Sequence, residues 1–171
     1  MAGNNDLTLN GVLSGNGTLN KNGLNNLTLG GNNTFAGILN ILSGTLSTAS
    51  SGALGNPAQI NLGNGAYLNL GGSLALGNLS GAGDVEVQSG NTLTVSSGTF
   101  AGDLSGSGIL DKTGSGTLTL TGSNSHTGAT TVSDGSLVVD GSLASSSVSV
   151  GNNPILAGSG DLAGAVSVVS G

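Results

Sequence analysis

The sequence predicts an all-β protein, a parallel β-helix (β-solenoid) in which short strands coil around one narrow core. Three observations favour this fold class. Aliphatic residues alternate with polar ones in short runs, glycine supplies 34 of the 171 residues, and a stretch of about thirty residues occurs twice. Only 6% of the residues are charged and 2% are aromatic, whereas roughly a quarter of an ordinary soluble domain is charged. The core must therefore consist of Leu, Val, Ile and Ala.

The short strands are indicated by a hydrophobic period of two. Alternation of this kind places the aliphatic side chains on one face and Ser, Thr, Asn or Asp on the other. No helical spacing is sustained, and each glycine would cost a helix about 1 kcal/mol relative to alanine. The alternating aliphatic pairs are Ile60 and Leu62, Leu68 and Leu70, Leu74 and Leu76, Val85 and Val87, Leu93 and Val95, Leu118 and Leu120, Val148 and Val150, and Val166 and Val168.

Strands at this spacing fit either a sandwich of hairpins or a solenoid. Sandwiches usually show aromatic cross-strand pairs and charged edge strands, and both are nearly missing here. The solenoid is therefore favoured, with an interior too narrow for large rings. Gly and Asn are expected at corners that need positive φ, and Asn side chains are expected to form hydrogen-bonded ladders from coil to coil. At roughly twenty to twenty-five residues per coil, the chain would form about seven or eight coils.

An internal repeat covers residues 13–46 and again residues 104–137, without a gap. The two copies lie ninety-one residues apart, an offset that predicts about four coils. No linker separates them, so residues 1–171 are expected to form a single domain. The matched residues are Lys21 and Lys112, Gly31 and Gly122, Asn33 and Asn124, Gly37 and Gly128, and Gly44 and Gly135.

Residues 106–143 resemble the passenger-associated β-strand repeat of bacterial autotransporters. His126 stands where the family usually has an aromatic residue, a place that Phe35 fills in the first copy. The first copy departs further, since Asn25 replaces a glycine and Asn40 replaces a threonine. The residues that carry the resemblance are Gly106, Gly108, Leu110, Lys112, Gly114, Gly116, Leu118, Leu120, Gly122, Asn124, Gly128, Thr130, Val132, Gly135 and Leu137.

The resemblance implies a right-handed parallel β-helix displayed outside a Gram-negative cell after secretion through an outer-membrane barrel. Neither a signal peptide nor a barrel is recognised in the sequence, so the chain is expected to be part of a passenger. The activities of passengers vary and usually reside outside the repeats, so the repeat alone assigns no reaction.

The charge balance argues against several partners. The net charge is −6, with eight acidic residues, two lysines and no arginine. Nucleic acids and anionic membranes both attract cationic surfaces, so neither is expected to bind this segment. The chain has no cysteine, which excludes disulfides and thiolate metal sites. No cofactor is expected.

Several residues are candidates for chemistry, and each has a simpler structural explanation. His126 with Asp134 and a serine could form a triad, but its match with Phe35 favours packing. Asp84 and Glu86 point outward beside Val85 and Val87; they could bind a cation or act in acid–base catalysis, but a solvated acidic face is favoured. No catalytic, cofactor or metal residue is therefore assigned.

Other motifs are weaker. Lys21 and Lys112 are expected to cover a corner or pair with an acid such as Asp111 rather than contact a ligand. The segments 81–84 and 158–161 lack the tandem nonapeptides of calcium-binding repeats. Two threonine rows, 117–121 and 92–94, suggest an ice-binding array, although most coils carry Ser or Asn instead. The sequence also contains glycosylation tripeptides at Asn16, Asn26, Asn32 and Asn78, as expected by chance in an Asn-rich chain.

The sequence thus predicts a non-catalytic, surface-exposed module that acts as a rigid stalk for adhesion or cell aggregation. Solenoids with uncapped ends expose strand edges, so self-association end to end into filaments is expected. A host or a neighbouring cell surface is the other candidate partner. Two alternatives stay open, a carbohydrate-active enzyme of the lyase or hydrolase type and an ice-binding solenoid.

Overall fold

A computed structural model describes residues 5–169, and within them every regular element is a β-strand. The strands are β1 (Leu7–Leu9), β2 (Ser14–Gly15), β3 (Thr18–Lys21), β4 (Asn26–Leu29), β5 (Thr34–Phe35), β6 (Ile38–Ile41), β7 (Gly44–Thr48), β8 (Gln59–Leu62), β9 (Ala66–Leu70), β10 (Leu74–Gly81), β11 (Asp84–Val87), β12 (Thr92–Phe100), β13 (Leu104–Gly106), β14 (Ile109–Lys112), β15 (Thr117–Leu120), β16 (Ser123–Asn124), β17 (Thr130–Val132), β18 (Ser136–Val139), β19 (Ser142–Leu143), β20 (Ser147–Val150), β21 (Ile155–Ala157), β22 (Asp161–Leu162) and β23 (Ala165–Val168).

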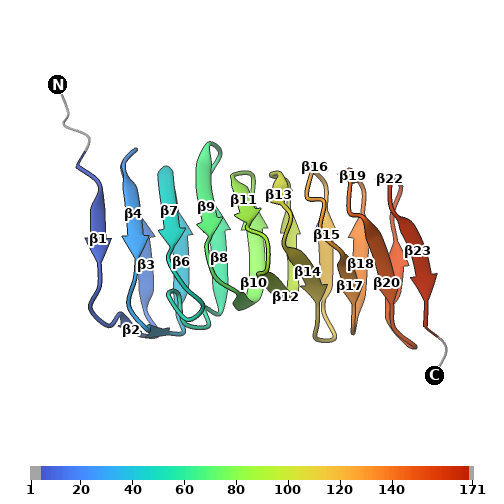
Figure 1. Cartoon of the computed structure of the whole chain (residues 1–171), viewed down its shortest axis with the longest axis horizontal. Helices are drawn as coiled ribbons and strands as arrows, with labels where there is room; N and C mark the ends of the chain where they lie inside the picture. Colours follow the sequence, from blue (N-terminus) through green and yellow to red (C-terminus); the bar gives the residue numbers. More distant parts are fainter. Residues whose placement is uncertain (1–4, 170–171) are drawn as a thin grey trace.

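The strands stack in parallel, turn upon turn, as a solenoid whose first turn lies at one end and whose last lies at the other (Figure 1). The all-β parallel solenoid predicted from the sequence is confirmed. It has about nine turns rather than seven or eight, because the turns are shorter than expected. Leu46 pairs with Leu68, a turn of 22 residues, and Leu68 pairs with Val85, a turn of only 17. Right-handedness stays a prediction.

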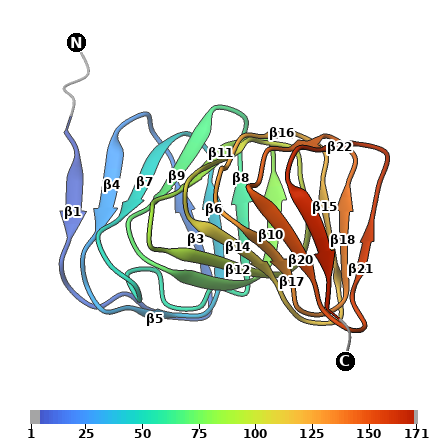
Figure 2. The same ribbon diagram turned by 45° about the vertical axis from the view of Figure 1, so that its right-hand side comes forward.

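Each turn passes over three faces in a constant order, and Figure 2 shows this path from an oblique side. Strands β10 and β12 run round a corner, so each contributes its first half to one face and its second half to the next. Face 1 consists of β1, β4, β7, β9, β11, β13, β16, β19 and β22. Face 2 consists of β2, β5, the first halves of β10 and β12, β14, β17, β20 and β23. Face 3 consists of β3, β6, β8, the second halves of β10 and β12, β15, β18 and β21.

The alternating aliphatic residues fill the core, as the period of two predicts. Seven of the eight predicted pairs are buried, and only Val166 and Val168 in the last turn are exposed. The expectation that large rings would not fit was wrong, because Phe35 and Phe100 are both buried. A turn of three strands is wide enough for one ring where its stacked neighbours are small: the residue paired with Phe35 in the first turn is Gly15.

Glycine alone supplies the left-handed backbone at the corners. Thirteen glycines have a positive φ, whereas no other described residue does, so asparagine does not have the corner role expected of it. Asparagine forms ladders instead. On face 3 the Asn40 amide donates to Asn20 over 2.7 Å and the Asn61 amide donates to Asn40 over 2.7 Å. Ser80 donates to Asn61 and continues the row.

The two copies of the repeat lie on different faces. In the first copy, residues 13–46, β2 lies on face 2 and β3 on face 3, whereas in the second copy, residues 104–137, β13 lies on face 1 and β14 on face 2. Each copy supplies six consecutive strands in the same order, β2 to β7 and β13 to β18. The offset is therefore four full turns and two further faces, not about four turns as expected. The repeat specifies strands and corners but does not specify which face they occupy.

Candidate functional site

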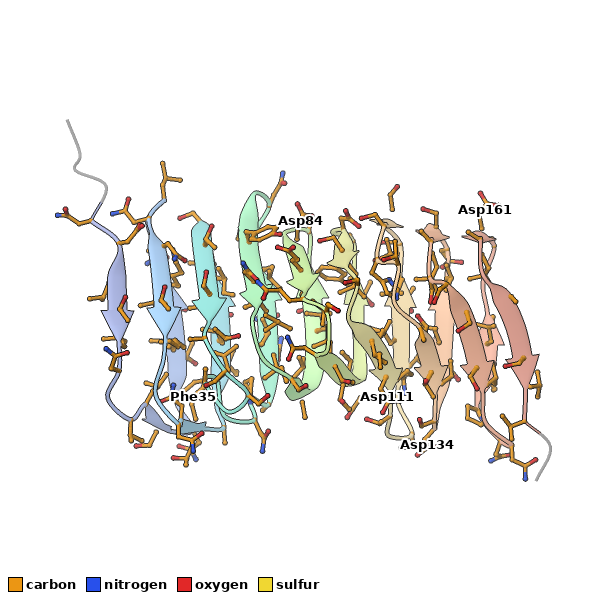
Figure 3. The ribbon with its side chains drawn as sticks, in the orientation of Figure 1. Phe35, Asp84, Asp111, Asp134 and Asp161 are labelled. Carbon is orange, nitrogen blue, oxygen red and sulfur yellow. The ribbon has the colours of Figure 1, made fainter. Side chains whose placement is uncertain are left out.

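The described residues contain no convergent set of reactive side chains. No group of three or more His, Cys, Asp or Glu residues that could hold a metal ion is found between residues 5 and 169. Asp84 lies at one long edge of the solenoid and Asp134 at the opposite edge (Figure 3). The candidate residues therefore do not share one site, and each has its own set of contacts.

His126 is a core residue. Its side chain is 1% exposed, and its Nε2 lies 3.0 Å from the Thr130 hydroxyl oxygen. Its Nδ1 is the one buried side-chain polar atom without a hydrogen-bond partner among the described residues. Burial lowers the pKa of His126 to about 4, against a smaller opposing effect of the Asp103 carboxylate. The structure does not bring His126 to Asp134, whose carboxylate accepts a hydrogen bond from the Gly135 amide.

Asn33 and Asn124 bridge three successive turns from inside the solenoid. The Asn124 side-chain oxygen accepts from the Leu104 amide in the turn before (3.3 Å), and its nitrogen donates to the Ser142 carbonyl in the turn after (3.0 Å). Asn33 accepts likewise from the Leu13 amide (2.6 Å) and donates to the Ala53 carbonyl. Each side chain thus replaces backbone hydrogen bonds where the ladder is interrupted. Sequence analysis matched the two residues but did not predict this role.

Lys21 and Lys112 turn inward and cap a corner. Lys112 is fully buried, and its ammonium donates to the carbonyl oxygens of Thr113, Gly114 and Asp134 over 2.8, 2.8 and 3.0 Å. Lys21 donates in the same manner to the carbonyls of Gly23 and Ser43.

Burial lowers the pKa of both lysines, and for Lys112 the carboxylates of Asp134 and Asp111 oppose that shift. The expectation that these lysines cover corners is confirmed. Neither one is placed to contact a ligand from solution, because their ammonium groups are directed at backbone carbonyls.

Asp84 and Glu86 form part of an outward-facing row on face 1. The Glu86 carboxylate accepts a hydrogen bond from the Tyr67 hydroxyl over 2.7 Å. Burial, together with Glu86, raises the pKa of Tyr67 to about 12. The Asp84 carboxylate accepts from the Asp103 amide in the next turn over 2.9 Å. Both carboxylates therefore fasten neighbouring turns to one another, a role that the solvated acidic face expected from the sequence did not include.

The matched glycines are needed where turns approach closely. A Cβ at Gly128 would lie 1.8 Å from the Gly108 carbonyl oxygen, and a Cβ at Gly37 would lie 1.9 Å from that of Gly17. Gly135 and Gly44 have φ values of +66° and +68°. Four of the repeat's glycines are thus explained by stacking and by corner geometry.

The threonine rows do not form one array. Thr117 and Thr119 lie on face 3, where they pair with Ser136 and Val138 in the next turn. Thr92 and Thr94 lie on face 2 and pair with Ile109 and Asp111.

The two glycine-rich segments, 81–84 and 158–161, do not form one site. Asp84 and Asp161, at the ends of these segments, are far apart (Figure 3).

One shallow depression on the surface crosses several turns near the corner between faces 2 and 3. Small and hydroxyl-bearing residues line it: Asn56, Pro57, Ala58, Ala75, Leu76, Gly77, Thr94, Ser96 and Thr113. This lining contains neither a charged nor an aromatic side chain.

None of the described residues belongs to a helix long and apolar enough to cross a membrane.

Comparison with protein families gives two matches within the chain. The Passenger-associated-transport-repeat matches residues 19–47 and residues 110–139, which correspond to β3 to β7 and β14 to β18. No curated protein and no solved structure matches the chain. Repeats of this kind imply a secreted or surface protein of a Gram-negative bacterium. Within its β-solenoid the chain therefore carries two passenger-associated-transport repeats, which indicate autotransporter passenger repeats.

Proposed function

We propose that this region is a non-catalytic, rigid spacer that holds other parts of a passenger away from the cell surface and supports adhesion or cell aggregation. The observation that carries the proposal is what the polar side chains inside the solenoid do. Asn33, Asn124, Lys21 and Lys112 all bind backbone groups, two of them across three turns. Side chains used in this way stiffen a stack and are not available for chemistry.

Rigidity can be measured on the chain itself. Because the chain has no cysteine, spin labels can be placed at Thr8→Cys in the first turn and Ser167→Cys in the last. Eight steps at about 4.8 Å per turn give an axial separation of roughly 40 Å, and the distance distribution is expected to be narrow. A broad distribution under dilute conditions would contradict the spacer role. Resistance to thermolysin, which cleaves beside aliphatic residues in segments that unfold locally, is a second expected property of a rigid stack.

A carbohydrate-active enzyme is the alternative from another class, and the contacts of Asp84 and Glu86 disfavour it. Both carboxylates bind neighbouring turns, and the depression between faces 2 and 3 offers no aromatic platform or cation for a sugar. Glycan-depolymerisation assays on the unmodified chain are expected to show no activity. Activity that Asp84→Ala or Glu86→Ala abolished would refute the non-catalytic proposal.

Self-association through the end turns is the second part of the proposal. It is supported by the exposed aliphatic residues of the first and last turns, such as Leu7 and Val168. A strand whose backbone N–H and C=O groups are unpaired on one side can form hydrogen bonds with a strand of another chain. Sedimentation at rising concentration is expected to show assembly, and electron microscopy is expected to show filaments. A monomer at all concentrations would refute it.

A further inference from the structure

The corner between β8 and β9 is longer than the corners stacked on either side of it. Three residues, 63–65, separate β8 from β9, whereas two residues separate β6 from β7 in the turn before and β10 from β11 in the turn after. The extra residue makes this corner rise above its neighbours (Figure 1). Asn64 and Gly65 are both exposed there, and no atom lies within 4 Å of a Cβ built on Gly65.

The backbone amide of Gly65 is free at the tip of a tight turn. The Ala66 amide closes this turn by donating to the Gly63 carbonyl over 3.0 Å. Gly65 has a φ of +76°, a conformation that glycine adopts without steric cost. Its own amide finds no acceptor among residues 5–169. The nitrogen that follows Asn64 in the chain is therefore open to solvent and to the Asn64 side chain.

An asparagine followed by glycine carries both reactants of an intramolecular reaction. The deprotonated amide nitrogen of the glycine attacks the side-chain Cγ of the asparagine and expels ammonia, which leaves a five-membered succinimide ring. Water then opens the ring at either carbonyl, so asparagine and water are converted into aspartate or isoaspartate and ammonia. The attacking amide has to be free, and the peptide between the two residues has to rotate. The glycines on both sides of Asn64 permit that rotation.

A second Asn-Gly pair lies at the same corner of the first turn, and its amide is not free. Asn22 and Gly23 connect β3 to β4, which lie on the same faces as β8 and β9. The Gly23 amide donates to the Ser43 hydroxyl oxygen over 3.0 Å, and the Gly23 carbonyl accepts from the Lys21 ammonium over 2.9 Å. Ring closure at Asn22 therefore has to break the bond to Ser43, while Lys21 holds Gly23 in place.

We propose that Asn64 is a site of spontaneous deamidation in the folded chain, with water as the co-reactant and aspartate and isoaspartate as the products. Both products fit this corner. The new carboxylate lies in solvent, and isoaspartate adds a backbone methylene to a loop that already stands clear of the neighbouring turns. The modification therefore accumulates without unfolding the solenoid, and it makes the chain one charge more negative than −6.

Peptide mapping measures the reaction at both asparagines in one sample. The folded chain is incubated at pH 8 and 37 °C and digested with pepsin in acid, where deamidation is slow. Mass spectrometry follows the conversion of each amide to an acid, and chromatography resolves isoaspartate from aspartate. A parallel sample in urea reports the reactivity of each pair without the fold.

Ser43→Ala is the matched variant for this experiment. It removes the acceptor of the Gly23 amide and retains the Ser43 carbonyl, which accepts from Lys21. Circular dichroism first establishes that the variant keeps the strand content of the unmodified chain. The comparison of folded and urea-treated samples of the unmodified chain does not depend on this variant.

The proposal predicts that Asn64 is converted at least tenfold faster than Asn22 in the folded chain and within threefold of Asn22 in urea. Ser43→Ala should raise the rate at Asn22 at least threefold and leave the rate at Asn64 unchanged. Similar rates at the two residues in the folded chain would overturn the proposal. A ratio in urea as large as the folded one would also overturn it, because the difference would then not come from the structure.

Discussion

Asn33 and Asn124 lie ninety-one residues apart and on different faces of the solenoid, and yet they make the same contacts. Each accepts a hydrogen bond from the amide twenty residues before it and donates to a carbonyl in the following turn. Each is also buried, at 7% and 1% exposed. The repeat therefore encodes a local clamp between three turns, which functions on whichever face it occurs.

Removal of this clamp is expected to destabilise the solenoid. Asn124→Leu leaves the Leu104 amide and the Ser142 carbonyl without partners inside the protein, and it should lower the free energy of unfolding by about 3 kcal/mol. Asn40→Ala, which removes an asparagine from the outward ladder on face 3, is the matched control and should cost less than about 1 kcal/mol. Urea denaturation of both variants provides the measurement. Equal losses would mean that the inward clamp has no special role.

The capping role of Lys112 can be tested by replacing it with a side chain of similar length that carries no charge. Lys112→Met fills the same space but cannot donate to the carbonyls of Thr113, Gly114 and Asp134, so the free energy of unfolding should fall by about 2 kcal/mol. Lys21→Met should cost somewhat less, because Lys21 caps two carbonyls rather than three. A stabilising effect of Lys112→Met in thermal denaturation would contradict the capping role.

His126 should make the stability of the chain depend on pH. Its pKa is about 4 in the folded state and near 6.5 when unfolded, so the unfolded chain binds the proton more tightly between these values. Stability is therefore complete above pH 6.5 and is lost progressively as the pH falls toward 4, by up to about 3 kcal/mol. The measurement is the urea midpoint at pH 7.5 and at pH 4.5.

His126→Phe is the control for this pH effect, since the first repeat carries Phe35 at the same position. The variant should keep the stability of the unmodified chain at pH 7.5 and show a smaller loss at pH 4.5. An unchanged loss would show that other groups cause the acid sensitivity.

The close approach of turns at the matched glycines gives a further test. Gly128→Ala puts a Cβ against the Gly108 carbonyl oxygen and should cost about 2 kcal/mol or more, because backbone has to move. Gly17→Ala is the matched control, since no atom lies within 4 Å of its added Cβ and its φ is not positive. This variant should be nearly neutral in thermal denaturation. A neutral Gly128→Ala would contradict the stacking of these turns.

The features of the fold that depend only on residues close together in the sequence, such as the strands and their buried faces, could be predicted. The alternation of Leu118 and Leu120 with threonines defines a strand and its buried face without reference to the rest of the chain. The matching of His126 with Phe35 correctly indicated packing. Asparagine ladders followed from composition and parallel stacking alone.

Features that depend on the length of a turn could not be predicted. Corners of different lengths separate Leu46 from Leu68 and Leu68 from Val85, and no local pattern specifies these lengths. An error of a few residues per turn accumulates, so the predicted number of turns and the predicted offset of about four turns between the repeats were both too small. The burial of Asn124 was missed because asparagine is usually exposed; its signal was its presence in both copies beside buried positions.

The most direct test of the central claim, that each turn stacks in parallel on the turn about twenty residues before it, is a pair of disulfide or short cross-links within one molecule. Thr119 pairs with Thr99 on face 3, whereas its counterpart in the first repeat, Thr28, lies on face 1. The account predicts that the Thr99→Cys, Thr119→Cys variant cross-links rapidly as a monomer and that the Thr28→Cys, Thr119→Cys variant does not. Cross-linking of the second variant without the first would contradict the solenoid described here.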